Sequence, residues 1–106
     1  MNKISNKTIK SVVKEIVRSF DPKLVILFGS YGRGKPTKES DLDLFIVANI
    51  KGSPPERFRC VQRAITASGF GIDVVIRTPE EFDRSMSGRD WFVQEIVEQG
   101  KVLYAQ

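Results

Sequence analysis

The chain has 106 residues and a mass of 12.0 kDa, which allows one hydrophobic core, so we expect a single domain over residues 1–106. Hydrophobic residues make up 41% and charged residues 28%, which excludes wholesale disorder, and the net charge of +4 suits an anionic partner without forming blocks of Lys and Arg. The sequence has no histidine, so nucleophile activation by histidine, histidine-ligated zinc and histidine-dependent ribonuclease chemistry are excluded.

The first part of the chain predicts a helix followed by a buried strand. Apolar residues recur with helical spacing over residues 6–19, which predicts an amphipathic helix that ends at Asp21-Pro22. A short apolar run over residues 23–28, bounded by Pro22 and Gly29, predicts a buried strand. The segment LFGSYGRGKP therefore spans the end of a strand and the loop after it.

The middle of the chain predicts two further strands with a helix between them. Residues 41–47 alternate, so that Asp41 and Asp43 share one face of a strand and the other face is apolar. Ser53-Pro54-Pro55-Glu56 has the spacing of a capping box with proline at the first helical position, which predicts a helix that runs to Gly69. Residues 72–76 form the next apolar strand.

The last part of the chain predicts two helices and an edge strand. Thr78-Pro79-Glu80-Glu81 repeats the capping pattern and starts a short helix. A second helix is expected over residues 90–99, ended by Gly100, and a terminal edge strand over 102–104. The inward residues of this second helix are expected to be Phe92, Val93, Ile96 and Val97. This order of elements predicts an α/β or α+β fold, a small mixed β-sheet with flanking helices.

The glycine-rich segment after the first strand has two interpretations. Gly29, Gly34 and Lys35 fit the start of a P-loop, but Pro36 stands where the hydroxyl that binds magnesium would be, and no helix comes after it. Alternatively, a Gly-Ser pair at a strand end offers backbone N–H groups and one hydroxyl to an oxyanion. We favour this second interpretation, a phosphate site that is not a P-loop. Arg33 could add a charge-assisted contact to it, or form a surface ion pair.

Three aspartates are candidates for a metal site. Asp41 and Asp43 lie about 7 Å apart along one strand face, close enough to converge on one or two divalent cations. A solvated strand face, or Asp41 as a turn residue, would also account for this pair. Asp73 interrupts an apolar strand, where a lone charge needs a partner. If the two strands are neighbours, the three carboxylates form the ligand set of a two-metal phosphoryl or nucleotidyl transfer site.

We expect a cytoplasmic protein. Cys60 is the only cysteine, which excludes an intrachain disulfide and fits a reducing compartment. No apolar run approaches the ~20 residues needed to span a bilayer. Lysines near the start resemble a signal peptide, but Lys14 and Glu15 interrupt the next segment before an apolar region develops.

The stretch GSYGRGKPTKESDLDLFIV, residues 29–47, resembles the signature of the minimal nucleotidyltransferase (MNT) domain of the polymerase β superfamily, GSxARGxxxxxSDxDL followed by apolar residues. The match includes Arg33, Gly34 and Ser40, and the family's third acidic strand falls on Asp73. The resemblance covers about residues 5 to 104. Gly32 departs from it by replacing an alanine, which weakens helix propensity by up to ~1 kcal/mol. Tyr31 stands at a position that is often arginine.

The resemblance implies a polymerase β-like fold and a mechanism. Asp41 and Asp43 would hold two Mg²⁺ ions, and Asp73 would share the catalytic ion and help orient the acceptor. The nucleotide site for ATP would include Gly29, Ser30, Arg33 and Ser40, with the Gly-Ser pair at the terminal phosphates. An acceptor hydroxyl would then attack the α-phosphate in line, and pyrophosphate would leave.

The resemblance also implies a protein partner. Small MNT proteins commonly pair with HEPN ribonuclease toxins, and some transfer AMP from ATP to a tyrosine of the toxin as antitoxins of type VII-like systems. A chain of 106 residues has no room for a separate acceptor-binding domain, which agrees with an acceptor on a partner. Tyr31, Phe82 or Trp91 could contact that partner, or could belong to the core.

Two rival functions remain open from the sequence. A non-catalytic antitoxin would neutralise its toxin by covering the toxin's active site, and such a protein would be expected to have lost one of the acidic residues, all three of which are present. Nucleotidyl transfer to a small molecule or to a nucleic acid end is the second rival, although larger relatives that do so carry extra domains.

Overall fold

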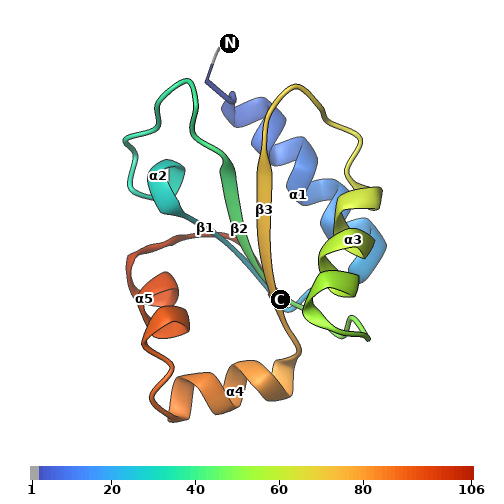
Figure 1. Cartoon of the computed structure of the whole chain (residues 1–106), viewed down its shortest axis with the longest axis vertical. Helices are drawn as coiled ribbons and strands as arrows, with labels where there is room; N and C mark the ends of the chain where they lie inside the picture. The colour runs from blue at the N-terminus through green and yellow to red at the C-terminus, as the bar shows by residue number, and fades with distance from the viewer. Residues whose placement is uncertain (1–2) are drawn as a thin grey trace.

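The computed structural model describes residues 3–106 as four strands and five helices in a mixed α/β arrangement (Figure 1). In chain order the elements are α1 (Asn6–Phe20), β1 (Leu24–Phe28), α2 (Gly29–Gly32), β2 (Leu42–Val47), α3 (Pro54–Ala64), β3 (Ile72–Arg77), α4 (Pro79–Ser87), α5 (Trp91–Gln99) and β4 (Lys101–Ala105). The sheet has the order β3-β2-β1-β4. Only β2 and β3 are parallel, because α3 carries the chain back between them, while β1 pairs antiparallel with both β2 and β4.

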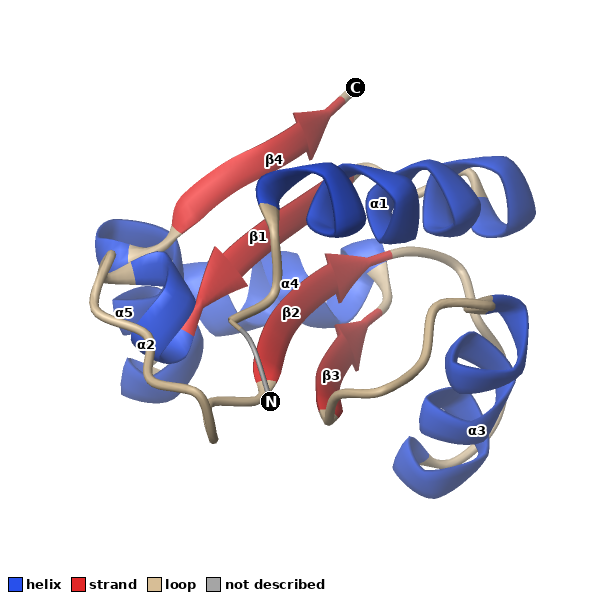
Figure 2. Ribbon diagram, turned by 90° about the horizontal axis from the view of Figure 1, so that it is seen from above, coloured by secondary structure: helices blue, strands red, loops and turns tan. Residues whose placement is uncertain are grey.

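Two clusters of apolar side chains cover the two faces of the sheet. On one face, α1 and α3 pack against the strands, with Val12, Ile16 and Val61 fully buried over Leu42 and Leu44 (Figure 2). The other face is covered by α4 and α5. Because side chains alternate along a strand, Asp43 points to the same face as Phe45 and Val47 of β2, which is this second face. The second cluster of buried residues consists of Ile26, Phe45, Val47, Val93 and Ile96.

Side-chain caps explain where three of the helices begin. The Ser5 hydroxyl accepts a hydrogen bond from the Thr8 N–H at the start of α1. Ser53 with Glu56, and Thr78 with Glu81, form complete capping boxes that start α3 and α4, as the sequence predicted. The predicted helices and strands are therefore confirmed in type and order, including the terminal strand β4.

Three local predictions were wrong. The helix expected to reach Gly69 ends at Ala64, because the Thr66 N–H and hydroxyl donate to Glu15 of α1 and hold the chain in a non-helical path. Phe92 was expected to point inward but is 52% exposed. β2 begins at Leu42, so Asp41 precedes the strand instead of opening it.

Among residues 3–106, no helix is both long enough and apolar enough to cross a bilayer.

Candidate active site at the end of the sheet

Two aspartates lie side by side on neighbouring strands. Asp43 of β2 is in register with Asp73 of β3, and across the antiparallel pairing it lies opposite Phe28, the last residue of β1. In-register residues of a parallel pair point to the same face, and adjacent strands are about 5 Å apart. The two carboxyl groups therefore share the face covered by α4 and α5, as predicted from the sequence.

The charges around Asp43 act on its pKa. Burial raises the pKa of Asp43 above its ordinary value of 3.8, and the Asp73 and Asp41 carboxylates raise it further, while the Arg33 guanidinium opposes the shift. The carboxylates are therefore close enough to repel one another, and among residues 3–106 no ion pair to Asp43 relieves that repulsion. Close carboxylates of this kind have the oxygen chemistry that Mg²⁺ prefers.

Asp41 lies just before β2, beside this pair, and its carboxylate raises the pKa of Asp43 from there. Its carboxylate lies against Gly71, the residue before β3, so that a side chain added at that glycine would require the Asp41 carboxylate to shift. Within residues 3–106, no group of three His, Cys, Asp or Glu side chains is arranged to hold a metal ion. Asp41 lies outside β2, so the pleat of the strand does not fix the direction of its side chain as it fixes that of Asp43.

Gly29 brings the backbone of α2 against Asp43. Its φ of +66° is a left-handed conformation that glycine adopts without strain, and a β-carbon built there would lie 2.9 Å from Cγ of Asp43. Short backbone hydrogen bonds shape the turn after it, with the Arg33 N–H donating to the Gly29 carbonyl and the Lys35 N–H to the Ser30 carbonyl, both at 3.0 Å. The Gly-Ser pair thus begins a helical turn at the strand end, as predicted.

The departures from the family signature have structural explanations. A β-carbon at Gly32 would lie 2.6 Å from the carbonyl oxygen of Leu27, so alanine does not fit at this position without a shift of the backbone. The Tyr31 hydroxyl accepts a hydrogen bond of 2.7 Å from the Ile4 N–H, which ties α2 to the segment before α1. Both residues therefore fit this chain's own packing.

The remaining predicted residues occupy different surroundings. Arg33 is exposed near Asp43, where its charge partly offsets the carboxylates. The Ser40 hydroxyl accepts a hydrogen bond of 2.8 Å from the Thr37 N–H and so stabilises the turn that leads into Asp41. Of the three aromatic residues considered for a partner contact, Tyr31 and Phe82 are partly buried, whereas Trp91 is 75% exposed.

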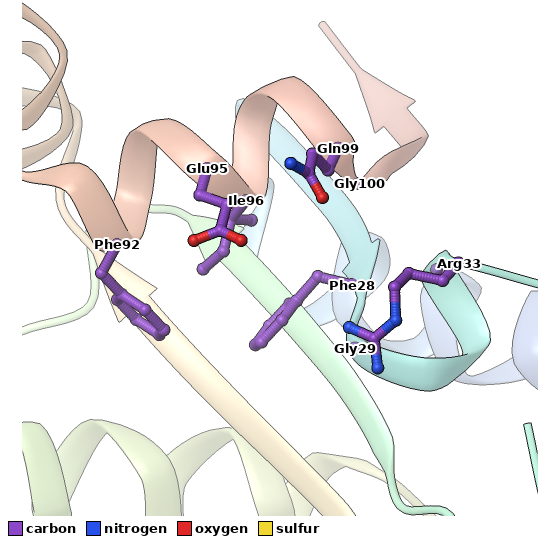
Figure 3. Close-up of a pocket in the computed structure, with 9 residues that line it drawn as sticks. Phe28, Gly29, Arg33, Phe92, Glu95, Ile96, Gln99 and Gly100 are labelled. Carbon is purple, nitrogen blue, oxygen red and sulfur yellow. The ribbon is translucent and has the colours of Figure 1, made fainter. Parts of the chain in front are cut away.

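A cavity of about 270 Å³ adjoins Gly29 and Arg33 on the face covered by α5 (Figure 3). Its other wall comes from α5, whose Phe92, Glu95 and Gln99 were not predicted as site residues. Their spacing of three and four residues places them on one face of a helix, so the pattern was visible in the sequence. Only the packing of α5 beside α2 shows that this face looks onto the site.

The fold places the chain among the nucleotidyltransferases. The chain belongs to the nucleotidyltransferase domain family, whose model matches residues 7–104. This match confirms the resemblance seen in residues 29–47.

Several known proteins are similar to this chain. A candidate protein adenylyltransferase of Methanocaldococcus jannaschii is 30% identical over 101 residues, which cover 92% of this chain and 96% of the relative. A crystal structure of a candidate nucleotidyltransferase from Sulfolobus solfataricus superposes with a TM-score of 0.64 at 26% identity, covering 94% of this chain and 79% of that one. A toxin–antitoxin structure with AMP-PNP gives 0.59 at 24% identity, covering 92% and 73%. A variant of the MntA–HpeT toxin–antitoxin gives 0.58 at 22%, with the same coverage.

Proposed function

We propose that this protein transfers AMP from ATP to a hydroxyl group of a partner protein, a HEPN-type ribonuclease toxin, and thereby acts as its antitoxin. The observation that carries the proposal is the in-register pair Asp43 and Asp73 beside the backbone of Gly29. This arrangement places two carboxylates that could bind a cation next to the end of β1, where backbone N–H groups could bind phosphate. Transfer of AMP is supported by the adenylyltransferase relative, and a toxin partner by the toxin–antitoxin structures that share the fold.

The donor set fits magnesium. Asp43 and Asp73 are already neighbours, and Asp41 acts on the charge of Asp43 from the adjoining loop, where its exposed side chain is free to turn away from Gly71. Together the three residues would hold Mg²⁺, which acidifies the acceptor hydroxyl and offsets negative charge on the transferred phosphoryl group. One MntA–HpeT variant replaces two aspartates spaced two residues apart, which is the spacing of Asp41 and Asp43.

The other residues of the site bind and orient the donor. Backbone N–H groups at Gly29 and Ser30 and the Ser30 hydroxyl would bind the β- and γ-phosphates, and Arg33 would add a charge-assisted contact. Ser40 supports the loop that carries Asp41. In the reaction, the acceptor oxygen forms a bond to the α-phosphorus, the bond between the α- and β-phosphates breaks, and pyrophosphate leaves with the developing charge. The hydroxyl proton is released to solvent.

The acceptor reaches the site from the side of β3. Asp73 lies on this outer strand of the sheet, so a tyrosine of the partner can approach it without crossing β1 or α2. Trp91 at the start of α5 is 75% exposed, and we propose that it contacts the partner.

The test is mass spectrometry of the partner encoded in the neighbouring reading frame, after incubation with this protein, ATP and Mg²⁺. The intact mass of the partner should rise by one or more AMP units with the wild-type protein and with the control Asp83→Asn, an exposed aspartate of α4. Asp43→Asn should abolish the rise. If the wild-type protein and Asp43→Asn both block the toxin without any change of mass, the protein is a binding-only antitoxin.

A further inference from the structure

The cavity beside Gly29 combines an apolar floor with a polar rim. Phe28 and Phe92 meet edge to face with their ring centroids 6.4 Å apart, and Ile96 extends this apolar surface (Figure 3). Glu95 and Gln99, one helical turn apart, line the cavity from α5, the helix that also carries Phe92 and Ile96. The volume of about 270 Å³ lies below the range of about 300–1,000 Å³ typical of sites for drug-sized ligands. It suits one ring system and not a complete nucleotide.

The chemistry of the wall selects the kind of group that binds. A carboxylate such as Glu95 only accepts hydrogen bonds and repels phosphate, so the part of the cavity that α5 lines is not an extension of the phosphate site. A planar heteroaromatic ring matches it better, because its face can pack on Phe28 and Phe92 while its edge reaches the polar side chains. An amino group on that edge would donate to Glu95, and the carboxamide of Gln99 can both donate and accept.

The position of the cavity indicates that a heteroaromatic ring bound there belongs to the donor nucleotide. Gly29 and Arg33 line the cavity and also belong to the segment proposed to hold the phosphates of the donor. Asp73, which faces the acceptor, lies on β3, and β2 separates that strand from β1. A ring in the cavity is therefore close to the donor's side of the site and remote from the acceptor's.

We propose that this cavity binds the nucleobase of the donor nucleotide, and that Glu95 and Gln99 select a base with an exocyclic amino group. The inference rests on the proposed nucleotidyl transfer and extends it by naming the residues that recognise the base. Adenine fulfils the requirement through its 6-amino group. Hypoxanthine carries a carbonyl oxygen at the same position, which would face the Glu95 carboxylate without a shared proton.

Calorimetric titration with three probes tests this assignment. ATP carries the amino group, ITP replaces it with a carbonyl, and inorganic tripolyphosphate has no base. Phe92→Ala should weaken ATP binding about tenfold and leave tripolyphosphate binding unchanged, because only the base contacts the ring. Phe92 is 52% exposed, so this variant should remain folded.

The roles of Glu95 and Gln99 are tested by comparing the affinity of the protein for ATP with its affinity for ITP. The wild-type protein should bind ATP about tenfold more tightly than ITP. Glu95→Gln should remove most of that preference, because the new amide can donate to the carbonyl of hypoxanthine. Gln99→Ala should weaken both nucleotides and leave tripolyphosphate unchanged. The matched control is Glu98→Gln, which removes a carboxylate from the same helix outside the cavity and should behave as the wild type.

The outcomes separate this inference from the proposed function. If ATP binds and AMP is transferred but Phe92→Ala and Glu95→Gln behave as the wild type, the base lies elsewhere and only the inference fails. Equal weakening of ATP and tripolyphosphate by Phe92→Ala would also overturn it. If the wild-type protein neither binds ATP nor transfers AMP, both fail.

Discussion

The contact between Gly29 and Asp43 gives the sharpest test of the site. Gly29→Ala adds a β-carbon that would lie 2.9 Å from Cγ of Asp43 and closer still to one of its oxygens, so the carboxyl group must move. The same substitution places a non-glycine residue at a φ of +66°, which costs about 1–2 kcal/mol. We expect the melting temperature to fall by about 4–8 °C for each kcal/mol lost. Because a displacement of about 1 Å in a catalytic group can cost about a hundredfold, AMP transfer should fall by about that factor.

Gly34→Ala is the matched control for this prediction. Gly34 also has a left-handed φ, of +75°, but within the described part of the chain no heavy atom beyond its two chain neighbours lies within 4 Å of a β-carbon built there. It should therefore show the same loss of stability, measured by thermal unfolding, with nearly wild-type release of pyrophosphate in the presence of the partner. Equal loss of activity in both variants would refute the reasoning, because the effect would then arise from backbone strain and not from the displaced carboxylate.

Three further predictions concern pH and packing. Burial and the neighbouring carboxylates raise the pKa of Asp43, so its stabilising contribution is fully present below the ordinary pKa of 3.8 and is lost as pH rises through the higher folded pKa. In magnesium-free buffer Asp43→Asn should therefore melt a few degrees higher than the wild type at pH 7, and that gain should disappear below pH 3.8. The hydrogen bond from Arg57 at 2.7 Å holds the pKa of Glu81 at about 2, so Glu81→Gln should lower the free energy of unfolding by about 1 kcal/mol at neutral pH, and denaturant titrations should show this difference fading as pH falls from 4.5 through about 2. Gly32→Ala should cost about 1–3 kcal/mol in the same assay because of the Leu27 carbonyl, and a stabilised variant would show instead that helix propensity outweighs this contact.

The order and type of the elements could be predicted because they rest on local patterns. Capping boxes at Ser53 and Thr78 mark helix starts through hydrogen bonds that span three residues, and they form in the structure as the sequence indicates. The end of α3 could not be predicted in the same way. Its last turn is cut short by hydrogen bonds from Thr66 to Glu15, a residue of another helix far along the chain.

The candidate site also combines features that follow from local sequence patterns with features that depend on long-range contacts. The period of two fixed the face of Asp43, and the in-register pairing of β2 with β3 confirms that Asp73 joins it. Asp41 was assigned to that face by extending the same alternation one residue beyond the strand; its carboxylate lies next to Gly71, the residue before β3, and raises the pKa of Asp43.

The sequence by itself determined the family, the strand faces and the glycine at the end of β1, because each depends on residues that are close together along the chain. Only the tertiary structure decided that α5 lies beside α2, so that Phe92, Glu95 and Gln99 line a cavity next to Gly29 (Figure 3). The physical reason is that α5 packs across the sheet through Val93 and Ile96, and this burial turns the neighbouring positions of the helix toward the site. The contact between α5 and the segment at Gly29 depends on how both pack on the sheet, so no local sequence pattern shows that the two lie together.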